Sequence, residues 1–204
     1  MDEAAGWAAI EAALERAYGH VQPYGHLGTQ VPYSVGGPDP LDGISIYRRT
    51  APVPHWHLVG FGMSELYSKD SDDPAISGYG FEFSARVADH GDDEVPMWAA
   101  VLLQVLARYV VGNRPFAPGH TIHVAPGTFG AGTETELAAL AFAVDPDLGV
   151  IDTPHGAVTF LEVAALTEDE YAAAKGGNTA TVLDRISARS TRPLVIDRTR
   201  GSLL

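Results

Sequence analysis

The sequence predicts an α+β protein with a mixed, mainly antiparallel β-sheet and helices packed on it. Stretches with strand periodicity are clustered along the chain and only a few stretches have helical periodicity, so repeated βαβ units are not indicated. The 204 residues, of which 46% are hydrophobic, form a typical globular composition. A chain of this size can bury about 70% of its unfolded surface in one core. Because neither repeats nor a low-complexity linker occur, we expect residues 1–204 to form a single domain.

The N-terminal part of the chain begins with an expected helix over residues 2–18, where Trp7, Ile10 and Leu14 follow a helical spacing. The glycine- and proline-rich residues 19–43 predict an ordered loop. We expect one short extended piece in that loop, around residues 29–35.

Three strands are expected next. Residues 44–47 alternate, and residues 55–63 are rich in aromatic and branched side chains. Residues 79–87 predict a half-buried strand, because apolar and polar positions alternate strictly. Its apolar positions are Phe81, Phe83, Ala85 and Val87, and its polar positions are Glu82, Ser84 and Arg86.

A long amphipathic helix is expected to follow, with Pro96 in its first turn. We expect its apolar positions to form one buried face against the sheet that contains Phe81 and Phe83. The positions expected to be buried are Trp98, Leu102, Val105, Leu106 and Tyr109, and Val101 and Val110 continue the same helical spacing.

The C-terminal half predicts further short strands and two helices. A capping box at Thr167–Glu170 predicts a helix that ends near Gly176 and Gly177. The remaining elements are expected extended runs at 121–124, 137–144 and 157–165, a helix at 180–188 and a final strand at 193–197.

Charge and composition exclude several classes of function. A net charge of −13 argues against binding to a phosphate backbone, so nucleic acid is not an expected partner. The absence of cysteine excludes disulfides, thiolate nucleophiles and thiolate metal sites. Residues 1–20 have no signal-peptide pattern, and no apolar run is long enough to cross a bilayer. We therefore expect a cytoplasmic protein without a membrane partner.

Familiar catalytic and nucleotide-binding motifs are missing: the chain has no GxSxG, HExxH, GxxxxGK[ST] or GxGxxG. The strongest candidate for metal chemistry is the alternating pair His55 and His57, which share one face of a strand. Two imidazoles supply only half of a tetrahedral shell, so we favour a structural role for them and expect no metal and no cofactor. Acidic groups such as Asp39 and Asp42 are assigned to side-chain hydrogen bonds in loops.

The charge is unevenly distributed along the chain. Between Glu65 and Glu94, nine acids face Lys69 and Arg86, a net charge of −7. This segment is either a solvated acidic face, which we favour, or a site for a basic partner.

Several short motifs, in a fixed order, resemble the Suppressor of fused family. They cover nearly the whole chain: Gly36–Asp42, His55–His57, Ser64–Tyr67, Ser77–Glu82, Leu106–Val110, Thr153–Val158 and Pro193–Asp197. The resemblance implies a mixed α/β domain of about this size without an established enzymatic activity. Animal relatives hold an extended peptide between this domain and a second one, so the resemblance implies a protein partner.

The same resemblance implies candidate binding residues. Tyr109 matches a peptide-contacting tyrosine of the animal family, although its helical position also fits a core residue. In the family, a second peptide-contacting residue is an aspartate just before a histidine that follows a glycine. This aspartate has no counterpart, because Gly119 here leads directly into His120. The candidate partner-binding residues are Tyr109, His120, Trp56, His57, Asp39 and Asp42.

Three hypotheses of function remain in order. The first is a non-catalytic protein-binding domain, such as the immunity proteins that bacterial members resemble, which would sequester a toxin or another protein. The second is an adaptor that binds an extended peptide at an exposed sheet edge. The third is a metal-dependent hydrolase that uses the His55 and His57 region. The sequence does not specify an oligomeric state.

Overall fold

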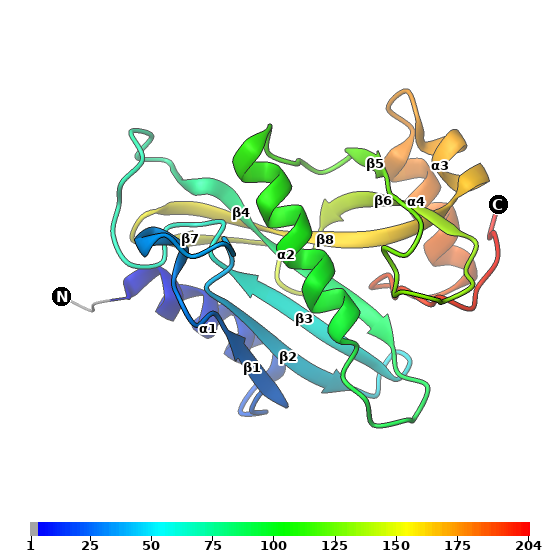
Figure 1. The fold of residues 1–204 in the computed structure, drawn as a ribbon, viewed down its shortest axis with the longest axis horizontal. Coiled ribbons are helices and arrows are strands. Elements are labelled where there is room, and N and C mark those ends of the chain that lie inside the picture. Colours follow the sequence, from blue (N-terminus) through cyan, green and yellow to red (C-terminus); the bar gives the residue numbers. More distant parts are fainter. Residues whose placement is uncertain (1–3) are drawn as a thin grey trace.

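The computed structural model describes residues 4–204 and contains one mixed sheet with helices on both of its faces (Figure 1). The helices are α1 (Ala5–Tyr18), the 3₁₀ helix η1 (Tyr33–Val35), α2 (Met97–Gly112), α3 (Glu168–Ala174) and α4 (Thr179–Arg189). The strands are β1 (Gly25–Gly28), β2 (Gly43–Arg49), β3 (His55–Phe61), β4 (Ile76–Ala88), β5 (Thr121–His123), β6 (Leu137–Val144), β7 (Val150–Thr153) and β8 (Gly156–Thr167).

The sheet has the strand order β1-β2-β3-β4-β8-β6-β5, and β7 pairs with β8 outside this path. Only β4 and β8 are parallel, and the other named pairs are antiparallel. The expected mixed, mainly antiparallel α+β class is therefore confirmed. Strands β1 and β5 are the two ends of this path.

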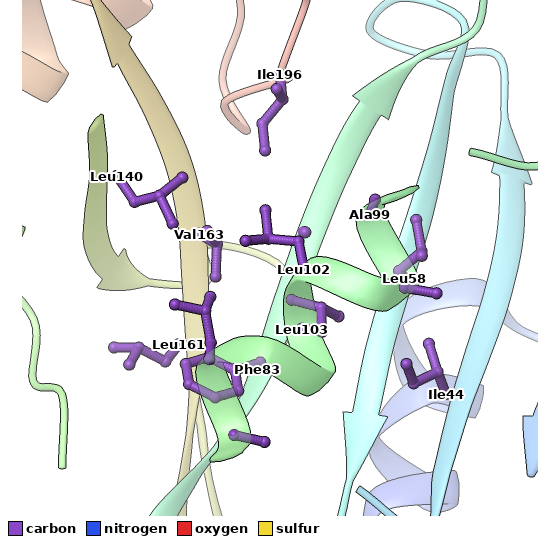
Figure 2. Close-up of a cluster of buried hydrophobic side chains, with 14 of the residues drawn as sticks. Ile44, Leu58, Phe83, Ala99, Leu102, Leu103, Leu140, Leu161, Val163 and Ile196 are labelled. Carbon is purple, nitrogen blue, oxygen red and sulfur yellow. The ribbon is translucent and has the colours of Figure 1, made fainter. Parts of the chain in front are cut away.

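The largest apolar cluster lies between α2 and the sheet (Figure 2). Leu102 and Leu103 of α2 meet Phe83 of β4 and Leu161 of β8, and all four side chains are buried. On the other face of the sheet, α1 covers one part, and α3 and α4 cover the part formed by β6 and β8. The sheet is thus the middle of three layers.

The buried face of α2 differs from the expected one. Leu102, Leu106 and Val110 are buried, but Val101, Val105 and Tyr109 point to solvent. The helix is turned because small residues face the sheet and permit a close approach. These residues are Ala99, Ala100 and Ala107.

The expectation of a half-buried strand at 79–87 is also wrong. The polar positions Glu82, Ser84 and Arg86 are all fully buried, because the loop after β3 and the turn after β6 contact this face of β4. Glu82 accepts hydrogen bonds from the backbone amides of Gly62, Met63 and Ser64 and from the Ser64 hydroxyl. A buried polar strand face is stable only when its groups are paired in this way.

Some expected elements are displaced. The extended piece of the first loop was expected around residues 29–35, but it lies at Gly25–Gly28. The expected range instead contains the 3₁₀ helix η1. The final strand reduces to one bridge between Ile196 and Val87, because the segment around it leaves the sheet. The capping box is confirmed, since the Thr167 side chain accepts a hydrogen bond from the Glu170 backbone amide and the Glu170 carboxylate accepts one from the Thr167 backbone amide.

Candidate protein-binding surface

An exposed apolar stripe follows the outer side of α2. Met97, Val101, Val105 and Tyr109 are spaced four residues apart, and they are 50%, 57%, 46% and 43% exposed. Residues at this spacing lie on one side of a helix. Contiguous exposed apolar side chains of this kind often mark interaction sites. We call these four residues the α2 stripe.

Tyr109 ends the α2 stripe and packs on the loop that leads to the edge strand β5. Its ring stacks on Phe116 with centroids 5.5 Å apart, and Phe116 stacks on Phe142 of β6 at 4.1 Å. The His120 carbonyl accepts a hydrogen bond from the Phe142 amide, and the exposed His120 side chain precedes β5 directly. Phe116 and Phe142 therefore connect the two candidate residues, Tyr109 and His120.

The outer backbone groups of β5 are free to pair within the described part of the chain. Two backbone hydrogen bonds show which residues of this segment face β6. They run from the Phe142 amide to the His120 carbonyl and from the Val124 amide to the Ala138 carbonyl. In an antiparallel pair, alternate residues bond inward. The amides and carbonyls of Thr121 and His123 therefore face away from β6.

Asp39 and Asp42 lie at different places. Asp39 forms an ion pair with Arg108, the residue next to Tyr109 on α2. Asp42 accepts a hydrogen bond from the Tyr33 amide at 3.4 Å and helps to line a separate hollow of about 450 Å³, together with Tyr33 and Tyr67. The structure thus brings Asp39, but not Asp42, to the outer side of α2.

Trp56 and His57, two of the sequence-derived candidates, lie in the interior. Trp56 is 1% exposed, with Tyr24 against its ring edge and the Arg48 guanidinium over its face. His57 has no exposed surface. Because β3 is covered on both faces, neither side chain presents a contact to a partner in this structure.

His57 belongs to a buried polar cluster formed with Tyr18, Arg86, Asp145 and Glu162. Its Nδ1 contacts the Tyr18 hydroxyl and its Nε2 lies 3.5 Å from Asp145 Oδ2. Burial lowers the pKa of His57 to about 4, and the nearby Arg86 charge acts in the same direction. The imidazole is therefore neutral near pH 7.

Arg86 is the centre of this buried polar cluster. It donates to Asp145 through both Nη atoms, to Glu162 at 3.3 Å and to Asp147 at 2.8 Å. The sequence interpretation missed this cluster, because alternation alone does not tell whether a polar strand face is solvated or covered. The one local signal was the arginine at position 86 among the polar residues of the strand.

The metal-dependent hydrolase has no support in this geometry. Within residues 4–204, no three His, Cys, Asp or Glu side chains are grouped so that they could hold a metal ion. The imidazole of His57 contacts protein groups on both sides and is closed off from solvent, so a substrate has no path to it.

A sheet covered by helices, with an exposed apolar stripe and an unpaired edge strand, defines an α+β domain of the protein-interaction class. The family comparison agrees. Residues 37–201 match the model of the Suppressor of fused protein (SUFU) family. The chain therefore belongs to the Suppressor of fused family.

The relatives include the Suppressor of fused homologs of Homo sapiens and Mus musculus, each 35% identical over 168 residues. These alignments cover 76% of this chain and 34% of each relative, so the chain spans about a third of the length of the curated relatives it matches.

Solved structures share the fold. A Sufu chain from the crystal structure of the Sufu-Fu complex has a TM-score of 0.88 and 30% identity, with 98% of this chain and 93% of that chain covered. Drosophila Suppressor of Fused has a TM-score of 0.87 and 30% identity, and the match covers 98% of this chain and 51% of the Drosophila chain. A SUFU homolog from Neisseria gonorrhoeae shares the fold, with a TM-score of 0.66 at 14% identity over 98% of this chain and 97% of that one.

In the described part of the chain, none of the helices combines the length and the apolar character needed to span a bilayer.

Proposed function

We propose that residues 1–204 act as one non-catalytic, cytoplasmic protein-binding domain, and that the domain binds its partner at the surface formed by Tyr109, His120 and the outer edge of β5. The observation that carries this proposal is the coincidence of an exposed aromatic residue and an unpaired strand edge, joined by the Phe116 and Phe142 rings. An extended partner segment can add a strand to such an edge, and nearby side chains then select its sequence.

Tyr109 contributes a large amphipathic contact in this surface. Its ring is supported by Phe116 from below, so little conformational entropy is lost when a partner covers the other face. His120 is held at the start of β5 by the hydrogen bond from the Ala117 amide to its Nδ1, which leaves the rest of the ring exposed. The Sufu chain in the Sufu-Fu complex offers a precedent for a protein partner of this fold.

A basic protein is the partner class that the charge favours. The net charge of −13 attracts a basic partner over distances comparable to the screening length, about 8 Å at physiological salt. A toxin that is neutralised by this chain, as in the immunity proteins that bacterial family members resemble, is one such partner. A basic toxin is therefore the specific partner to be tested.

The experiment is co-purification of the native protein with its partner, followed by binding measurements on single variants. Tyr109→Ala and His120→Ala are expected to weaken the complex by about tenfold or more, the range of interface hot spots. Tyr33→Ala is the matched control, because Tyr33 is as exposed as Tyr109, at 43%, but lies on η1.

Circular dichroism shows whether each variant is folded. Hydrogen exchange adds a readout at the strand edge, since the amides of Thr121 and His123 should become protected in the complex. If Tyr109→Ala and Tyr33→Ala bind alike and these amides stay unprotected, the proposed surface is wrong. Expression of the partner with and without this chain then tests whether the partner is toxic.

A further inference from the structure

A second candidate surface lies at the opposite end of the strand path, where residues of β1 and α2 line a groove of about 380 Å³. Its apolar lining consists of Leu27 of β1 and Ile44 of β2 on one side, and Met97, Ala100 and Val101 of α2 on the other. Polar residues, among them Gln30 and Gln104, line the rest of the groove. Leu27 packs at the border of the core under α2. Met97 and Val101 are the half of the α2 stripe farthest from Tyr109 along the helix.

The outer edge of β1 beside this groove is unpaired within residues 4–204. The hydrogen bond from the Thr29 amide to the Asp42 carbonyl shows that Thr29 faces the neighbouring strand segment. Because alternate residues of an antiparallel pair bond inward, the backbone groups of His26 and Gly28 face away from β2. A Cβ added at Gly28 would meet only the Asp42 carbonyl, at 4.0 Å, so the sheet face at Gly28 is not covered. The outward backbone groups of His26 and Gly28 have no backbone partner among the described residues and can pair with another chain.

Charge at one end of the groove points to the kind of chain that fits. Met97 also borders a second hollow of about 250 Å³, which Asp92 and Glu94 line. Both carboxylates are exposed and form no ion pair in the described structure. The nearby guanidinium of Arg48 is occupied by Asp89 and Asp93.

Two further arginines lie near the groove. Arg108 is paired with Asp39 at the other end, and Arg198, on the far wall of the second hollow, donates to the Phe129 carbonyl and the Thr133 hydroxyl. Among the described residues, no lysine or arginine forms an ion pair with Asp92 or Glu94, so these two carboxylates are open to a basic group of a ligand.

We propose that this groove binds a short extended segment of a partner protein, with a main chain that adds a strand to β1. One apolar side chain of the segment fills the space between Leu27 and Val101, and a basic side chain lies beside Asp92 and Glu94. A free strand edge flanked by a helix gives affinity through main-chain bonds and specificity through the groove. The site goes beyond the Tyr109 and His120 surface: β1 and β5 are the two ends of the strand path, about 30 Å apart at the usual strand spacing.

The test uses a displayed library of short peptides that alternate apolar and polar residues and carry basic ends, and a second library with acidic ends. Selection is expected from the basic library only. Val101→Asp should weaken the selected peptide by about tenfold or more, because it places a charge in an apolar contact. Val150→Asp, the same change at a 59% exposed valine of β7, should leave binding unchanged.

Hydrogen exchange locates the peptide independently of any variant. The amides of His26 and Gly28 should become protected when the selected peptide binds, whereas those of Thr121 and His123 should not. The proposal is overturned if neither library yields a binder, if acidic peptides bind equally well, or if Val101→Asp binds as tightly as Val150→Asp. Tyr109→Ala should retain this peptide, so failure of the groove and failure of the Tyr109 surface are observed separately.

Discussion

Arg86 on β4 and Asp145, in the turn between β6 and β7, form a two-pronged ion pair inside the protein. Arg86 Nη1 lies 2.7 Å from Asp145 Oδ2, and Nη2 lies 3.1 Å from Oδ1. Both side chains are fully buried. Because Asp145 also accepts hydrogen bonds from the Leu148 amide and the Ser84 hydroxyl, this pair fixes the turn against the central strand.

We predict that Arg86→Leu lowers the free energy of unfolding by about 3–5 kcal/mol, the usual cost of removing one partner from a buried pair. The loss arises because Asp145 and Glu162 would be left as buried carboxylates without a cation. Arg108→Leu is the matched control: Arg108 is 45% exposed, and its pair with Asp39 should contribute about 0–1 kcal/mol. Urea unfolding measures both, and equal small losses would contradict a structural role for Arg86.

A second prediction concerns Glu162, the other carboxylate that faces Arg86. Its Oε1 accepts bonds from Arg86 and from the Leu194 amide, while its buried Oε2 has no partner. Burial raises the pKa of Glu162 to about 7, against the opposing effect of Arg86. A carboxyl whose pKa is raised by folding stabilises the protein fully below its ordinary pKa of 4.5, and this contribution is lost as the pH rises toward 7.

Between pH 4.5 and about pH 7, the free energy of unfolding should therefore decline less steeply in the Glu162→Gln variant than in the parent protein. Above pH 7 the variant should be at least as stable as the parent protein. Glu170→Gln makes the same change at a buried glutamate that Arg200 holds at 2.8 Å through both oxygens. Burial tends to raise the pKa of Glu170, but Arg200 and the amides of Thr167 and Leu203 outweigh it, so the pKa is lowered. This second variant should be less stable near pH 7. Unfolding curves across the pH range decide the matter, and a Glu162→Gln protein that is destabilised at high pH would refute the assignment.

The third prediction tests the orientation of α2. Leu106 is 4% exposed and packs toward the sheet, whereas its neighbour Val105 belongs to the exposed stripe. Leu106→Ala should cost about 2–5 kcal/mol of unfolding free energy, as is usual when a large core side chain is truncated. Val105→Ala should stay within about 0.5 kcal/mol, the range of surface changes. Similar losses for the two variants would mean that the helix is turned differently.

These cases show which parts of the structure local sequence could predict. The capping box at Thr167 and the helix that begins at Met97 depend on neighbours within one or two turns, so their residue types were sufficient. The rotation of α2 was missed, because the positions on both sides of the alanines are apolar and only the sheet decides which side is buried. Strand β1 was missed since Gly25 and Gly28 have low strand propensity and are ordered by pairing with β2.

The candidate site was predictable only in part, for a related reason. Tyr109 and His120 were identified by resemblance, and the structure places both at the surface. Trp56 and His57 were candidates from a short motif, but the residues that enclose them are far away in the sequence: Tyr24 contacts Trp56, and Tyr18 and Asp145 contact His57. Burial by distant segments leaves no local signal.

The last prediction concerns the acidic segment between Glu65 and Glu94, which the fold divides into two loops. Asp70, Asp72 and Asp73 precede β4, and Asp92 and Asp93 follow it. The thirteen residues of β4 separate the two loops by about 40 Å at the usual rise per residue. Since charges are screened over about 8 Å at physiological salt, the loops act on a partner as two independent sites.

We therefore compare two variants, one with the first three aspartates changed to asparagine and one with Asp92 and Asp93 changed in the same way. With the co-purified partner, association kinetics across a salt series should show a slower association and a weaker salt dependence for one variant only, namely the one whose loop lies nearer the interface. Circular dichroism confirms folding, which exposed acids should affect little. If the partner responded to net charge alone, the effect would scale with the number of charges removed in both variants. That result, or unchanged association in both, would show that neither loop directs the encounter.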